Sequence, residues 1–81
     1  MPDVREYLDS DGRSPYGRWF NALPAAAAAK IATHKTRLSL GNKSNCDPVG
    51  EGVFEKIIDY GPGYRMYFAN DGDQLILLLG G

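Results

Sequence analysis

The chain has 81 residues, which is enough for one small domain and too few for two. Nine Lys and Arg residues against ten Asp and Glu give a formal net charge of −1 at pH 7, so the basic excess that typifies nucleic-acid-binding proteins is absent. The single cysteine excludes an intramolecular disulfide, and no apolar run approaches the roughly 20 residues of a membrane-spanning helix, so we expect a soluble, cytoplasmic protein.

The first third of the sequence predicts a strand and a short helix. Residues 4–8 alternate as in a strand. Ser14 and Pro15 suit the N-cap and the first position of a helix, and apolar residues then recur at helical spacing as far as Leu23. Pro24 should end this helix, because helical geometry is disfavoured for the residue that precedes a proline.

A second, alanine-rich helix is predicted from Pro24 to about Leu40, with His34 on its packed stripe. Joined at Pro24, the two helices should form an αα-hairpin. The polar stretch 42–52 shows no periodicity and is expected to be a connection. Cys46 within it has neither a second thiol nor metal-ligand spacing, so we expect no metal and no cofactor.

Three strands are expected in the last third, at about 53–59, 64–70 and 74–79, with Gly-Pro-Gly and Asn-Asp-Gly-Asp as the turns between them. The last strand is apolar on both faces, which predicts a position inside the sheet. The sequence thus predicts one α+β domain over residues 1–81. Its order is β-α-α-β-β-β, with the N-terminal strand and helical hairpin packed on an antiparallel sheet.

The segment 59–68 (DYGPGYRMYF) combines a tight turn with a strand in which Arg65 and Tyr67 share the face opposite the apolar one. Together with Leu-Gly-Asn at 40–42 and PVGEGV at 48–53, it resembles the small bacterial toxins of the RelE/ParE superfamily, in particular the phage-derived addiction-module killer branch (HigB-like). The resemblance extends over most of the chain. It implies a RelE-like fold and the toxin role of a type II toxin–antitoxin system, acting as a ribosome-dependent mRNA endonuclease (mRNA interferase).

Toxins of this kind usually continue past two glycines, such as Gly80 and Gly81, with a basic residue and a C-terminal helix. We therefore expect a domain that lacks this helix and leaves one face of the strand at 75–79 uncovered. Exposed apolar area of that kind favours a partner, either a cognate antitoxin or a second copy of the chain in a homodimer. The ribosome and mRNA are the further partners that the resemblance implies, and no membrane partner is expected.

The resemblance singles out Arg65, Lys56 and Tyr67 as RNA-binding residues, with Arg65 and Lys56 also catalytic. In the implied chemistry the ribose 2′-hydroxyl attacks the adjacent phosphate, which requires a proton acceptor, a proton donor and a cation. Arg65 would stabilise the phosphate charge, Lys56 would neutralise charge or move a proton, and Tyr67 would stack on a base. The competing structural interpretation is an ion pair from Arg65 to Glu55 or Asp59 across the hairpin.

Two other functions stay open from the sequence. A non-catalytic protein that binds only an antitoxin or itself would fit the missing helix and the lack of basic excess. A gyrase-inhibiting toxin of the ParE type would share the fold but act on a protein–DNA complex. His34 is the residue type most often used for acid–base catalysis near neutral pH, yet its place on the packed stripe favours a structural role.

Overall fold

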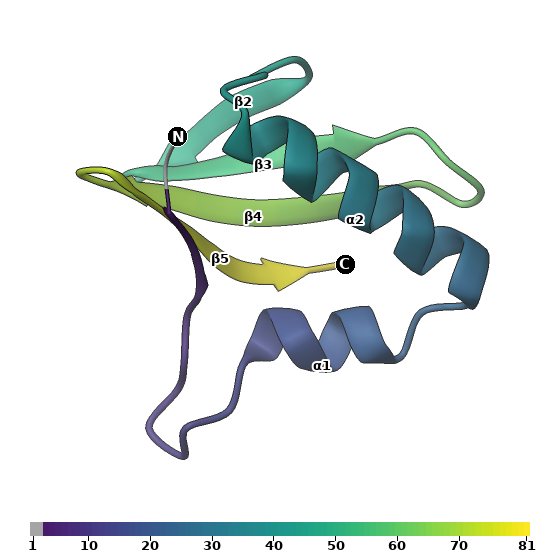
Figure 1. Ribbon diagram of the computed structural model, residues 1–81, viewed down its shortest axis with the longest axis horizontal. Helices are drawn as coiled ribbons and strands as arrows, with labels where there is room; N and C mark the ends of the chain where they lie inside the picture. The colour runs from purple at the N-terminus through teal and green to yellow at the C-terminus, as the bar shows by residue number, and fades with distance from the viewer. Residues whose placement is uncertain (1–2) are drawn as a thin grey trace.

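The computed structural model describes residues 3–81, which form two helices and five strands (Figure 1). In chain order the elements are β1 (Asp3–Glu6), α1 (Pro15–Asn21), α2 (Ala25–Ser39), β2 (Cys46–Gly50), β3 (Val53–Ile58), β4 (Tyr64–Asp71) and β5 (Gln74–Gly80). The α+β class is confirmed, and both predicted helices and all four predicted strands are present close to their expected bounds. Neither helix in this part of the chain is long and apolar enough to cross a membrane.

The five strands form one sheet in the order β1-β5-β4-β3-β2 (Figure 1). β5 lies inside the sheet, between β1 and β4, as its two apolar faces predict. The three strands expected in the last third pair antiparallel, but β1 joins β5 in parallel, with Val4 opposite Leu75 and Glu6 opposite Leu77, so the expected antiparallel arrangement does not extend to the whole sheet. The sheet is therefore mixed, and the long crossover that a parallel pair needs is supplied by everything between β1 and β5.

β2 lies within the stretch 42–52, so the prediction of a mere connection there is wrong. The chain reverses between β2 and β3 at Glu51 and Gly52, whose φ values of 54° and 79° are both positive, as a tight type I′ hairpin turn requires. Pro48 is tolerated because β2 is an edge strand, where a missing N–H interrupts no inner ladder. The periodicity gives no sign of this strand because all its residues after Cys46 are exposed.

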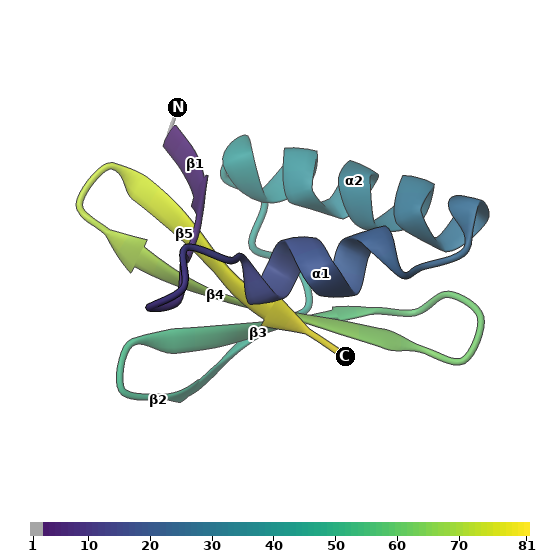
Figure 2. The same ribbon diagram turned by 90° about the horizontal axis from the view of Figure 1, so that it is seen from below.

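Both helices lie on one side of the sheet, and among the described residues no element covers the other side (Figure 2). α1 begins as predicted, with the Ser14 hydroxyl accepting a hydrogen bond from the Gly17 N–H at 2.9 Å and with Pro15 in the first turn. The connection through Pro24 then turns the chain into α2, so the predicted helical hairpin is present.

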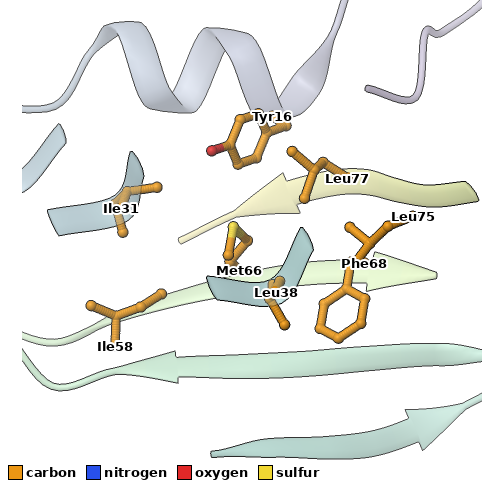
Figure 3. Close-up of a cluster of buried hydrophobic side chains, with 8 residues drawn as sticks. All are labelled: Tyr16, Ile31, Leu38, Ile58, Met66, Phe68, Leu75 and Leu77. Atoms are coloured by element: carbon orange, nitrogen blue, oxygen red, sulfur yellow. The ribbon is translucent and has the colours of Figure 1, made fainter. Parts of the chain in front are cut away.

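The core lies between the helices and the covered face of the sheet. It is a cluster of eight buried side chains (Figure 3): Tyr16, Ile31, Leu38, Ile58, Met66, Phe68, Leu75 and Leu77. Their alternation along β4 and their helical spacing along α2 are those predicted from the sequence. His34, also expected on the packed stripe of α2, is only half-buried.

Trp19 of α1 lies directly against Gly80 at the end of β5. A Cβ atom built at Gly80 would collide with the indole ring, so the missing side chain is what lets α1 approach the sheet here. The indole also meets the ring of Tyr64, with the two rings at 62° and their centroids 6.4 Å apart. Trp19 thus ties the first helix to the ends of β4 and β5.

Candidate functional site

The candidate site lies on the uncovered face of the sheet, on β3 and β4 (Figure 2). Alternate residues of β4 point into the core, which leaves Arg65 and Tyr67 on the open face. The strand register places Ile57 opposite Arg65, and Glu55 and Leu79 on either side of Tyr67. Ile57 is 38% exposed and Leu79 46% exposed, so apolar surface flanks the polar group.

One carboxylate oxygen organises this cluster. Oε2 of Glu55 accepts a hydrogen bond from Nη1 of Arg65 and another from the hydroxyl of Tyr67, each at 3.0 Å. The Glu55 side chain is 13% exposed and that of Arg65 is 57% exposed, so the carboxylate is sheltered while the guanidinium faces solvent. The ion pair considered as the competing interpretation of Arg65 therefore forms, and its partner is Glu55 rather than Asp59.

This hydrogen bond favours the protonated form of the Arg65 guanidinium and restrains the direction of its side chain. The hydrogen bond to Glu55, with the charge of that carboxylate and the neighbouring Tyr67, raises the pKa of the guanidinium. The bond to Glu55 uses Nη1 alone, which leaves the Nη2 and Nε groups for a second acceptor. A guanidinium held at one nitrogen and open at the others can bind a phosphate or carboxylate in a set orientation.

Lys56 does not share this site. It follows Glu55 on β3, so its side chain points to the opposite, helix-covered side of the sheet, where it is 2% exposed. Its ammonium group donates a hydrogen bond to the backbone carbonyl of Ser44. The expectation that Lys56 and Arg65 serve one phosphate is thus corrected, because strand alternation separates them.

His34 and Cys46 lie on the helix side with Lys56. Nδ1 of His34 is buried and has no hydrogen-bond partner within the described chain. Burial first, and then the charges of Lys56 and two further cations, lower the pKa of this imidazole, so it is neutral at pH 7. Burial raises the pKa of the Cys46 thiol, whose Sγ lies 3.6 Å from the carbonyl oxygen of Ser44. Within residues 3–81 no three His, Cys, Asp or Glu residues gather closely enough to hold a metal ion.

Glu55 has a larger role in the site than the sequence alone indicates. From the sequence it is only one of two partners for Arg65, whereas in the structure it connects Arg65 to Tyr67. The signal that finds it is the symmetry of the hairpin: a turn centred on Gly61 places position 55 opposite position 67 and position 57 opposite position 65. The cluster of Arg65, Glu55 and Tyr67 can therefore bind an anion with its guanidinium and accept a proton at the free oxygen of its carboxylate.

Comparison with known proteins identifies a relative of this chain. No protein-family model matches the sequence. Over 67 residues the chain is 39% identical to a Haemophilus influenzae protein described as uncharacterized, and the alignment covers 82% of this chain and 68% of that protein. The chain belongs to the family of this Haemophilus protein. That description assigns no activity, so a functional conclusion has to come from the site.

Proposed function

We propose that this chain has a RelE-like fold and is the toxin of a type II toxin–antitoxin pair that cleaves mRNA on the ribosome. The observation that carries the proposal is the exposed Arg65 guanidinium, held by Glu55 beside Tyr67 on the open face of the sheet. The open face gives an extended nucleotide chain room to lie across β3 and β4. The resemblance of segment 59–68 to the RelE/ParE toxins supports the same assignment.

In the proposed reaction, the ribose 2′-oxygen bonds to phosphorus and the bond from phosphorus to the 5′-oxygen breaks. The products are a cyclic phosphate and a free 5′-hydroxyl. The Arg65 guanidinium stabilises the negative charge that develops on the phosphate oxygens. The Glu55 carboxylate takes the proton of the 2′-hydroxyl, and a solvent water gives a proton to the leaving 5′-oxygen. A ring such as Tyr67 supports a neighbouring base by stacking. Lys56 is left out of this set because it is buried on the other side of the sheet.

A second candidate function is binding without catalysis. It is favoured by the finding that the two cations expected to work together, Arg65 and Lys56, lie on opposite faces, with Arg65 already paired to Glu55. On this alternative the open face, with Ile57 and Leu79 exposed on it, serves only to bind an antitoxin or a second copy of the chain.

The test is to induce the chain in bacteria and to follow growth, mRNA integrity and DNA integrity. Wild type is compared with Arg65→Ala and with Arg18→Ala, a matched control in which an exposed arginine on α1 is removed. We expect growth arrest and cut mRNA with wild type and Arg18→Ala, and neither with Arg65→Ala. Undiminished cleavage by Arg65→Ala contradicts the assigned site.

Two other outcomes distinguish the alternatives. Intact mRNA together with DNA damage points to gyrase inhibition of the ParE type. Normal growth points to the binding protein without catalysis, provided that the chain is soluble and its circular dichroism is that of a folded α+β protein.

A further inference from the structure

A hollow lies on the helix side of the molecule, away from Arg65. It is a pocket of about 300 Å³ between the two helices and β1, lined by Glu6, Tyr16, Gly17, Phe20, Asn21, Ala32 and Lys35. Its volume stands at the lower end of the range for ligand pockets, so it suits a small molecule rather than a nucleotide chain.

Tyr16, one of the residues in the pocket wall, carries a buried polar group without a partner in the described chain. The residue is 2% exposed, and its hydroxyl has no hydrogen-bond partner within the described chain. Figure 3 shows the hydroxyl pointing away from Leu77, toward the side on which Ile31 of α2 lies. Burial, reinforced by the charge of Glu6, raises the pKa of Tyr16 to about 12. The hydroxyl therefore keeps its proton near neutral pH and is available as a donor, and buried polar groups of this kind normally have a partner.

Besides the buried hydroxyl of Tyr16, the pocket wall contains a helical glycine, Gly17, which is also unfavourable for local stability. Glycine in a helix costs stability relative to alanine, yet here it occupies the first full turn of α1. A Cβ atom at this position would stand 3.0 Å from Oε1 of Glu6 and 3.2 Å from Oγ of Ser14. The same Oε1 accepts a hydrogen bond from the Ser14 hydroxyl at 2.6 Å. The glycine thus lets the Glu6 carboxylate stand close to α1 in a fixed place at the pocket.

Charges of opposite sign line the pocket without meeting. Glu6 comes from β1 and Lys35 from α2, and within residues 3–81 they form no ion pair. A carboxylate and an ammonium that share a small pocket but stay apart can each take a charged group from one bound molecule. Phe20, another residue of the pocket wall, stacks its ring on that of Tyr16 and offers apolar surface.

We propose that this pocket binds a small zwitterion of the amino-acid class. Its ammonium group contacts Glu6, its carboxylate contacts Lys35, and its side chain lies against Phe20 with the Tyr16 hydroxyl donating to it. This site is independent of the proposed nuclease function, because it uses the helix side of the sheet and none of the residues around Arg65.

The test is a titration of the full chain, labelled with ¹⁵N, with each standard amino acid up to about 10 mM, since ligands of this size bind with Kd values of roughly 10 µM to 1 mM. We expect at least one amino acid to give saturable shifts in the amides of α1 and α2. Trp19 supplies a second signal, because its ring centroid lies 5.7 Å from that of Tyr16 and its fluorescence should change on binding. The best ligand is then compared with its N-acetyl derivative, which lacks the ammonium, and its amide, which lacks the carboxylate.

Single substitutions assign each contact. Glu6→Gln keeps an acceptor for Ser14 but should weaken binding of the zwitterion about tenfold or more, while its effect on the N-acetyl derivative is small. Lys35→Gln should likewise weaken binding of the zwitterion, while its effect on the amide derivative, which lacks the carboxylate, is small. Tyr16→Phe should weaken binding without unfolding the chain, and Lys30→Gln, an exposed change on the same helix, should leave the affinity unchanged.

Three outcomes overturn the proposal. The first is that no amino acid gives a saturable shift in a chain that is folded by circular dichroism. The second is that both single-charge derivatives bind as tightly as the parent, so that the paired charges play no part. The third is that the shifts gather around Arg65 and Tyr67 on the open face instead of at the pocket.

Discussion

Arg65 and Glu55 lie diagonally on neighbouring strands, and the guanidinium donates from Nη1 to Oε2 of the carboxylate at 3.0 Å. The sheltered member of the pair is the acid and the exposed member is the cation. Such a pair contributes little to stability because one partner stands in solvent. Its consequence is instead to hold the guanidinium by Nη1 alone while the side chain stays exposed, so that an anion can reach the remaining N–H groups.

Substitution of Arg65 and Glu55 should separate orientation from charge. Arg65→Lys keeps the positive charge but loses the planar fork, so we expect mRNA cleavage to fall about tenfold or more. Glu55→Gln keeps an acceptor for Arg65 and Tyr67 but removes the proposed proton acceptor, and we expect a loss of about a hundredfold or more. Both are measured as rates of cleavage on programmed ribosomes, with unfolding midpoints as the control for the fold. Full activity in Glu55→Gln would exclude the carboxylate as the base.

Replacement of Lys56 by methionine should be harmless. The ammonium is buried on the helix side with the Ser44 carbonyl as its acceptor, and an apolar side chain of similar length avoids desolvating a charge. We expect the urea midpoint of Lys56→Met to equal or exceed that of wild type, and mRNA cleavage to be retained. Lys56→Ala should instead lose about 2–4 kcal/mol through the cavity it leaves. A Lys56→Met protein that is folded but does not cleave mRNA would show that Lys56 takes part in catalysis.

The stability of the fold should fall as the pH drops through the range in which His34 titrates. Its pKa in the folded chain lies below the ordinary value of about 6.5, so the unfolded chain takes up the proton first. The contribution of the neutral imidazole is complete above about pH 6.5 and is lost progressively below it.

The measurement is the urea midpoint at several pH values between 8 and 5, for wild type and for His34→Gln. Over this range wild type should lose more stability than the variant, because the glutamine cannot be protonated next to Lys56 and the other cations. Equal slopes in the two proteins would show that His34 is not the group responsible.

A methyl group at position 80 should push α1 off the sheet. Gly80→Ala places a Cβ atom in the Trp19 ring, so we expect a loss of about 1–3 kcal/mol of unfolding free energy. The matched control is Gly81→Ala, whose Cβ meets no atom within 4 Å and which should change stability by less than about 0.5 kcal/mol.

The cause can be checked with a double-mutant cycle. Trp19→Leu costs stability alone, but together with Gly80→Ala it should cost less than the sum of the two, by about 0.5–3 kcal/mol. Additive effects would mean that the alanine acts on the β5 backbone and not on the indole.

Much of this fold follows from short stretches of sequence. The Ser14 cap, the helix-breaking Pro24 and the turn at Gly61–Gly63 depend on the conformational preferences of single residues, and each is found where it was predicted. The alternation around Arg65 likewise settles which side chains of β4 face the core. These features are local, so the sequence by itself determines them.

Other features depend on which segments meet. The edge strand β2 carries no periodic signal, and its pairing becomes visible only when β3 lies beside it. The parallel pairing of β1 with β5 depends on how the helices cross the sheet. Lys56 looks like an ordinary strand lysine until the turn at Ser44 closes over it, and Gly80 looks like part of a tail until Trp19 covers it. Long-range packing decides burial and partnership, and no local pattern encodes it. The tertiary structure alone therefore decided that Lys56 is buried and opened the pocket between the helices.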